Sequence, residues 1–158
     1  MSTFTLIHVA ISLVGILTGF IVLFGLLASK LFRVPTAVFL WTTLATSVTG
    51  FFFPFHRFTP AIGVGILSVL ILIPVFYALC VRKLTGHWRW IYVVGAVTAF
   101  YFNYFVLIVQ SFQKIPALHA LAPTQQELPF VLAQGAALVL FVALGILAVR
   151  RFRPEGNL

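Results

Sequence analysis

Five long apolar runs, separated by short stretches that hold most of the charged residues, constrain this chain more than any other feature. A helix that crosses a bilayer needs about 20 predominantly apolar residues. The runs predict one all-α domain over residues 1–158, a polytopic transmembrane bundle of five helices at about 4–29, 35–54, 60–82, 88–111 and 125–150. A soluble domain would carry about 25% charged residues, whereas this chain has 8% charged and 62% hydrophobic residues.

Prolines and one polar motif mark the predicted helix boundaries. Pro35 and Pro60 suit the first turn of a helix, and Pro74 lies inside the third run, where it predicts a kink. Thr124-Gln-Gln-Glu127 is a capping-box pattern that predicts the start of the fifth helix. The first run has no positively charged leader and is longer than the core of a secretory signal, so we expect it to remain as a membrane helix.

The basic residues divide unequally between the two faces that five helices define. One face holds Arg57 and Lys114, and the other holds eight residues: Lys30, Arg33, Arg82, Lys83, Arg89, Arg150, Arg151 and Arg153. Because Lys and Arg are enriched in cytoplasmic loops, this pattern predicts an inner-membrane protein of a bacterium, with the N-terminus outside and the C-terminus in the cytoplasm. Lipid headgroups account for the net charge of +8, so no nucleic-acid partner is expected.

Three of the four histidines, His8, His56 and His119, are predicted at the outer face. Neutral imidazole is a good ligand for zinc, copper and haem iron. These residues could form a metal site, with Glu127 as a fourth ligand or as the acceptor of a hydrogen bond from a ligating histidine, or they could hold a b-type haem. No pair has close ligand spacing such as His-x-x-x-His, so the alternative is that the histidines only form hydrogen bonds at the membrane interface.

Polar side chains at the same predicted depth suggest an outward-facing pocket. One face of the first helix carries His8, Ser12, Gly15 and Gly19, and one face of the second carries Thr42, Thr46, Thr49 and His56 if that helix runs through Pro54. Gly15 and Gly19 would let another helix approach closely. Because amides in a bilayer are costly unless they face the bundle interior, the pocket is predicted to be lined by Ser12, Asn103, Gln110, Gln113, Lys114 and Gln134. Each amide could instead only hold helices together.

The outer loop, at about residues 112–124, is predicted to be ordered. Ile115, Leu118 and Leu121 recur every three residues between Pro116 and Pro123, which indicates a short interfacial helix. That helix would cover the pocket as a lid and turn His119 inward. Lys114 and Glu127 flank the loop and could form an ion pair.

Several chemistries lack the residues that they need. The chain has no Asp and only two Glu, which disfavours carboxylate pairs, two-metal sites and calcium or magnesium cages. Nucleotide-binding glycine motifs, His-Glu-x-x-His and Gly-x-Ser-x-Gly are also missing. The single Cys80 excludes an internal disulfide, and its apolar surroundings predict a buried, inert thiol. An enzyme of this sequence would have to use histidine or a cofactor.

The stretch Leu6-Ile-His8-Val-Ala-Ile-Ser12-Leu-Val-Gly15-Ile-Leu-Thr-Gly19, with the later Phe55-His56-Arg57, resembles uncharacterised small multi-pass membrane proteins of bacteria. Those proteins carry a histidine early in the first helix and a His-Arg near a helix end, and they are weakly similar to predicted b-type cytochrome helix bundles. The resemblance covers about the first 60 residues. It implies haem b ligation by His8, His56 or His119, but the histidine pairs at two depths of a two-haem cytochrome are missing.

Three functions follow from the sequence. The first is a binding or accessory subunit of a membrane complex, whose partners are lipids, other membrane subunits or further copies of the chain. The second is a redox protein with haem or a metal on the outer histidines. The third is a transporter of a small molecule or a lipid. Whether the chain is an enzyme stays open.

Overall fold

The fold was described from a computed structural model, in which residues 2–54 and 59–154 are placed, and within these ranges all regular structure is helical. The elements are α1 (Thr3–Leu27), α2 (Arg33–Gly50), α3 (Pro60–Phe76), the π-helix η1 (Tyr77–Val81), α4 (Trp88–Lys114), α5 (Pro116–Leu121) and α6 (Leu128–Arg151). Four segments are long and apolar enough to cross a membrane: α1, α3 continued by η1, α4 and α6. The all-α prediction is confirmed, and the four long apolar helices are compatible with a multi-pass membrane protein. The count of five spans and the orientation of the termini stay predictions.

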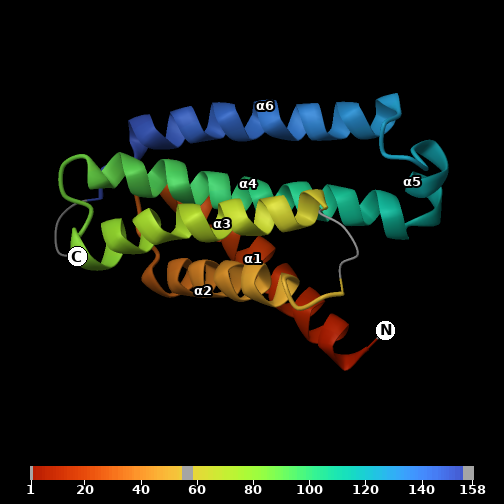
Figure 1. Ribbon diagram of the computed structural model, residues 1–158. Coiled ribbons are helices and arrows are strands. Elements are labelled where there is room, and N and C mark those ends of the chain that lie inside the picture. The colour runs from red at the N-terminus through yellow and green to blue at the C-terminus, as the bar shows by residue number, and fades with distance from the viewer. Residues whose placement is uncertain (1, 55–58, 155–158) are drawn as a thin grey trace.

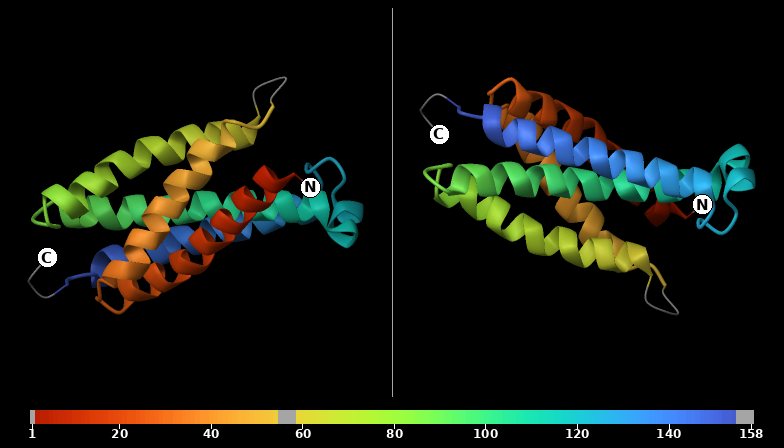
Figure 2. Two further views of the ribbon diagram at one scale, coloured as in Figure 1. Left: turned by 90° about the horizontal axis from the view of Figure 1, so that it is seen from below. Right: turned by 90° about the horizontal axis from the view of Figure 1, so that it is seen from above.

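Helix α4 is the centre of the bundle, and it contacts every other helical element (Figure 1). The remaining long helices form an arc around it, because α6 packs against α1, α1 against α2, and α2 against α3. The right-hand view of Figure 2 shows the first half of α4 between α6 and α3, whereas α6 crosses over its second half. The arc is therefore open between α3 and α6.

Three predicted helix ends are shifted by three or four residues in the structure, and one of them is the end of α4, at Lys114 rather than at about residue 111. Helix α2 ends at Gly50, and the backbone N–H groups of Phe51, Phe52 and Phe53 instead form i→i−3 hydrogen bonds of 3.1, 3.1 and 3.4 Å. The expectation that this helix runs through Pro54 is wrong. Helix α6 begins at Leu128 rather than near residue 125, and its N-cap residue forms no side-chain capping bond.

A widened helix turn follows Pro74, the residue at which a kink is predicted. Pro74 has no N–H to donate to the preceding turn, and one turn later the chain enters η1, where the N–H of Arg82 reaches the carbonyl of Tyr77 at 3.0 Å. The next residues, Lys83 and Leu84, both have positive φ, at 50° and 56°. Cys80 lies in η1 and is exposed, so the prediction of a buried thiol is wrong.

Glycines allow the tightest contacts between helices. A Cβ atom on Gly95 of α4 would lie 2.3 Å from Cγ2 of Val75, which is fully buried on α3. A Cβ atom on Gly19 of α1 would lie 2.5 Å from the ring of Phe100 on α4. The interior between these contacts is filled by aromatic and aliphatic side chains, among them Phe100 stacked edge-on against Phe141 of α6 at 5.2 Å. Such close packing holds membrane helices together where no hydrophobic effect acts between them.

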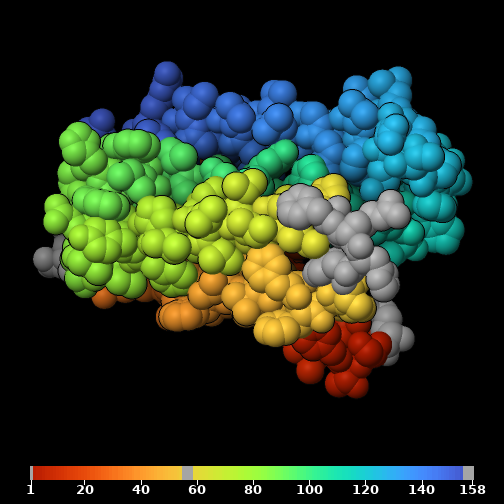
Figure 3. All heavy atoms as spheres, in the orientation of Figure 1, coloured from red at the N-terminus to blue at the C-terminus, as the bar shows by residue number. Residues whose placement is uncertain are grey.

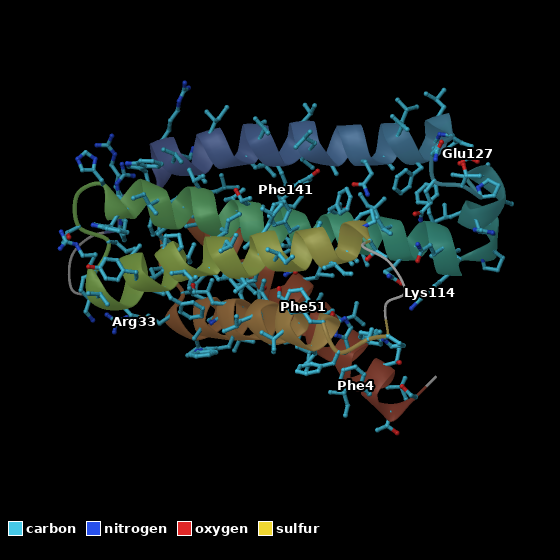
Figure 4. All side chains as sticks on the ribbon, viewed as in Figure 1. Phe4, Arg33, Phe51, Lys114, Glu127 and Phe141 are labelled. Carbon is cyan, nitrogen blue, oxygen red and sulfur yellow. The ribbon has the colours of Figure 1, made fainter. Side chains whose placement is uncertain are left out.

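The two ends of the bundle differ in charge. One end, called here the basic end, collects the residues Lys30, Arg33, Arg82, Lys83, Arg89, Arg150, Arg151 and Arg153 at helix termini and connections. The opposite end, called the histidine end, contains the start of α1, the end of α4, α5 and the start of α6. Figure 4 shows Arg33 at the first end and Lys114 with Glu127 at the second.

Candidate functional site

A row of polar contacts joins α1 to α2 near the histidine end. We call it the polar seam, and it pairs three positions of α1 with three of α2: His8 with Thr49, Ser12 with Thr46, and Gly15 with Thr42. Each partner lies one helical turn from the next, which is the i, i+4, i+7 spacing of a single helix face. The two faces that the sequence pattern indicates therefore pack against each other.

The His8 ring is held by α2 in one defined orientation. Its Nδ1 lies 2.8 Å from Oγ1 of Thr49. The Thr49 hydroxyl donates its single hydrogen to the carbonyl of Ala45, at 2.7 Å. Because a carbonyl can only accept, Thr49 Oγ1 must accept from His8 Nδ1–H. This assigns the proton to Nδ1 and leaves the Nε2 lone pair available for a ligand when the ring is neutral.

An aromatic side chain and a cation complete the surroundings of His8. The Phe53 ring packs edge-on against the imidazole, with centroids 5.0 Å apart and planes at 81°. The positive charge of Lys114, at the end of α4, also acts on His8. The start of α1, the end of α2 and the turn after it therefore contact each other around one imidazole.

The other two seam positions are simple helix contacts. The Ser12 hydroxyl donates to the carbonyl of His8 at 2.8 Å and lies 3.4 Å from the Thr46 hydroxyl. A Cβ atom on Gly15 would lie 3.1 Å from Oγ1 of Thr42. The missing side chain at Gly15 thus allows α2 to approach α1 closely, as the small-residue pattern predicts. At Gly19 it allows the ring of Phe100 on α4 to approach instead.

The amides of α4 and α6 bind neighbouring helices. Asn103 Nδ2 donates to Oγ1 of Thr43 at 2.9 Å, which joins α4 to the buried side of α2. Gln134 Nε2 donates to the carbonyl of Phe105 at 3.2 Å, which joins α6 to α4. The Oε1 atom of Gln134 is buried and has no hydrogen-bond partner among the described residues. Both amides therefore have a structural role at these contacts.

The loop between α4 and α6 is ordered, as predicted, but it does not turn its histidine inward. It contains α5, between Pro116 and Leu121, and every residue of α5 is at least partly exposed. His119 is exposed, so the expectation that it faces a pocket under a lid is wrong. Gln125 attaches this loop to α4, because its Nε2 donates to the carbonyl of Val109 at 2.9 Å.

Glu127 binds its own loop rather than Lys114. Its Oε1 accepts from the N–H and the hydroxyl of Thr124, at 3.1 and 2.9 Å, and its Oε2 accepts from the N–H of Gln126 at 3.1 Å. Partial removal from water would raise the pKa of this carboxyl, but the hydrogen bonds outweigh that effect and hold the pKa below its ordinary value. The predicted ion pair with Lys114 is wrong, and half of the predicted capping box forms as a loop turn.

The predicted metal ligands are placed only in part. His56 lies outside the described residues. Among the ranges 2–54 and 59–154, no group of three or more His, Cys, Asp or Glu side chains is arranged to hold a metal ion. The combination of His8, His56 and His119, with or without Glu127, therefore stays a prediction.

The remaining residues that are predicted to line the polar pocket do not lie at the two cavities of the structure. Gln110 is half-buried, while Gln113 and Lys114 are exposed. An open apolar groove of about 510 Å³ runs between α4 and α6, and a smaller pocket of about 190 Å³ lies at the basic end beside Thr36 and Cys80. Neither cavity is lined by a residue of the predicted polar pocket.

Two residues with structural roles, Thr43 and Arg89, are not marked as such by the sequence patterns. Thr43 is fully buried and accepts the hydrogen bond from Asn103. The helical spacing of Thr42, Thr46 and Thr49 instead indicates the neighbouring face of α2 as the polar one. In the sequence, Arg89 is one of the basic residues that predict the membrane topology. In the structure, its guanidinium also donates a hydrogen bond to the end of α6. No local pattern marks either role, because both depend on which helix lies opposite.

Comparisons with protein-family models, curated proteins and solved structures find no match for this chain.

Proposed function

We propose that this chain is a five-span protein of a bacterial inner membrane, with the basic end in the cytoplasm, and that it serves as a binding or accessory subunit of a membrane complex. The four apolar helices support membrane insertion. The charge difference between the two ends supports the orientation, because Lys and Arg favour the cytoplasmic side. The assignment to a bacterial membrane rests on the proposed resemblance of the first 60 residues to small bacterial multi-pass proteins.

The distribution of polar residues on α2 supports its assignment as a membrane-spanning helix, in addition to the four helices that are long and apolar enough by composition. Its polar side chains Thr36, Thr43 and Ser47 are 2%, 0% and 8% exposed, whereas Trp41 is 62% exposed. A helix that is polar inside and apolar outside suits lipid rather than water as its surroundings. The lower overall apolarity of α2 thus comes from groups that face other helices.

The observation that carries the accessory role is that His8, Ser12, Asn103 and Gln134 each contact a polar group of a neighbouring helix. His8, Ser12 and Asn103 all point at hydroxyls of α2, and Gln134 points at a backbone carbonyl. Such bonds set the positions of helices. The outer face of α6, uncovered in Figure 3, presents exposed apolar side chains such as Val139 that suit lipid or a partner helix.

Photo-cross-linking in the native membrane tests the accessory role. A photoreactive residue replaces Val139 on α6, and a matched one replaces the similarly exposed Phe24 on α1. We expect the probe on α6 to form one protein adduct of discrete mass. Native mass spectrometry of the extracted complex should then show this partner in a fixed ratio to the chain. Lipid adducts alone at both positions, with a free monomer after extraction, would refute the subunit role.

Cysteine accessibility tests the orientation. In a Cys80→Ser background, single cysteines replace Gln113 at the histidine end and Thr85 at the basic end, both of which are exposed. A membrane-impermeant maleimide should label position 113 in intact cells and position 85 only after the inner membrane is opened. Equal labelling of the two positions in intact cells would exclude five spans.

A second candidate function is a redox or metal-binding role for the outer histidines, and the His8 tautomer favours it. Metal-binding histidines commonly donate one ring N–H to a protein oxygen and ligate through the other nitrogen. The Nδ1–H bond to Thr49 gives His8 that arrangement. Glu127 is less suited to join it, because its oxygens accept three hydrogen bonds within its own loop.

Absorption spectra of the oxidised and dithionite-reduced protein, with elemental analysis, test this second role. Bound haem b or stoichiometric metal should disappear in His8→Ala and fall in Thr49→Val, which frees the ring without removing it. A Ser12→Ala variant, one turn along the seam, is the matched control. Colourless, metal-free protein from cells supplied with haem and metals would rule this function out.

A further inference from the structure

The groove between α4 and α6 has apolar walls and opens away from the rest of the bundle. Its α4 wall runs from Val94 to Phe102 and its α6 wall from Leu138 to Arg150, and no residue of α1, α2 or α3 lines it. It therefore lies on the open side of the arc, next to the bilayer. At 1.5 Å per residue, the α6 wall is about 18 Å long, a length that suits an extended hydrocarbon chain.

One end of the groove is charged. Arg150, exposed in the last turn of α6, lines it at the basic end, where Arg151 and Arg153 follow in the chain. The carboxylate of Glu127, the sole acidic side chain within the described ranges, lies at the far end of the bundle. Trp90, in the first turn of α4, is 45% exposed at the basic end and suits the headgroup depth.

We propose that this groove binds one anionic phospholipid, with an acyl chain between α4 and α6 and the phosphate on the guanidinium of Arg150. Charge complementarity selects this occupant over a second copy of the chain. A second copy in the same membrane orientation would bring its own basic end beside this one. An anionic lipid instead supplies the charge that this end lacks, and arginine binds phosphate through two parallel hydrogen bonds.

Gly145 creates the room for the acyl chain. It lies on the groove wall of α6, and a Cβ atom there would already be 3.4 Å from Cγ1 of Val97 on the opposite wall. A leucine at position 145 would have to extend into the groove. Gly135, nearly three turns earlier on α6, has no atom within 4 Å of its Cβ position and lies outside the groove, so it offers a matched control.

Native mass spectrometry of the purified, delipidated full chain tests the proposal. The protein is titrated with equal amounts of palmitoyl-oleoyl phosphatidylglycerol and phosphatidylcholine. We expect one bound phosphatidylglycerol in preference to phosphatidylcholine. Arg150→Gln should lower this preference about fivefold, the effect of one basic residue near an anionic lipid, and Arg151→Gln should lower it much less. Gly145→Leu should reduce binding of both lipids, and Gly135→Leu should not.

Three results would overturn the proposal. The first is equal binding of the two lipids to the unmodified chain. The second is an equal effect of Arg150→Gln and Arg151→Gln, which would mean diffuse attraction to the basic end. The third is a lipid-free dimer, which would place a second copy in the groove. If Gly145→Leu does not fold, the exposed Arg150 position still decides between these outcomes.

Discussion

The guanidinium of Arg89, in the first turn of α4, donates a hydrogen bond of 3.1 Å to the carbonyl of Val149 in the last turn of α6. The same nitrogen also donates to the carbonyl of Phe152. The final carbonyls of a helix have no partner within the helix and carry partial negative charge, so a cation from a neighbouring helix stabilises this end. Nearby, the backbone N–H of Arg153 donates to the Ser29 hydroxyl at 2.8 Å, which ties the chain after α6 to the connection between α1 and α2.

Replacing Arg89 with methionine should therefore loosen the end of α6. Hydrogen bonds to charged groups contribute about 1.5–3 kcal/mol, so we expect a loss of that order in the free energy of unfolding. The measurement is unfolding in a mixed detergent with increasing dodecyl sulfate, followed by circular dichroism. Arg151→Met, at an exposed position of the same end, is the control, and identical curves for the two variants would contradict the assigned role.

Gly95 should be intolerant of a methyl group. Alanine at this position would place a Cβ atom 2.3 Å from Val75 Cγ2, and overpacking of this kind costs about 1–3 kcal/mol. The double variant Gly95→Ala with Val75→Ala should recover part of that loss, because the shorter side chain makes room. Gly135→Ala should leave the unfolding midpoint unchanged or raise it, since its Cβ position is open. Additive losses in the double variant would show that the clash is relieved elsewhere.

The Asn103–Thr43 bond should contribute little to stability. Hydrogen bonds between membrane helices average about 0.6 kcal/mol in double-mutant cycles. Asn103→Leu and Thr43→Val, alone and combined, should give a coupling energy of about this size in the same unfolding assay. A variant that folds normally but loses a bound ligand would instead show that Asn103 belongs to a binding site.

Glu127 should order its loop down to acidic pH. Because its folded-state pKa is below the ordinary value of 4.5, the stabilisation is complete above pH 4.5 and disappears as the pH falls through the lower folded-state pKa. Carbon-13 NMR of the side-chain carboxyl should give a titration midpoint below 4.5. Thr124→Val, which keeps the N–H donor and removes the hydroxyl, should raise that midpoint. A midpoint that Thr124→Val leaves in place would mean that the hydroxyl bond does not form in solution.

Local sequence patterns predict much of this fold and little of its site. The lengths of the apolar runs and the positions of Pro35 and Pro60 predict the long helices, because membrane thickness and proline sterics act locally. The 3.6-residue period also identifies the two faces of the polar seam. The end of α2 is different: Pro54 marks a boundary, but the choice of Gly50 depends on the turn at Phe51–Phe53.

The site prediction depends on histidines that lie at the same depth in the membrane, and equal depth does not bring side chains together. His8 and His119 both belong to the histidine end, yet one binds α2 and the other is exposed on α5. Depth follows from topology, whereas the direction of a side chain depends on how each helix is rotated about its axis. For the same reason the sequence gives no sign of the α4–α6 groove, whose walls read as ordinary lipid-facing residues.

The π-helix η1 holds one residue more than an α-helical turn of the same rise. Deleting a single residue there, such as Cys80, would let the segment close as a regular α-helix. Because the π turn already takes up that extra residue locally, the positive-φ turn at Lys83 and Leu84 would keep nearly the same orientation relative to α3. Within Tyr77–Val81, the deletion of one residue should therefore be tolerated. The insertion of a further residue should not, because it would rotate the chain beyond it by about 100° relative to α3.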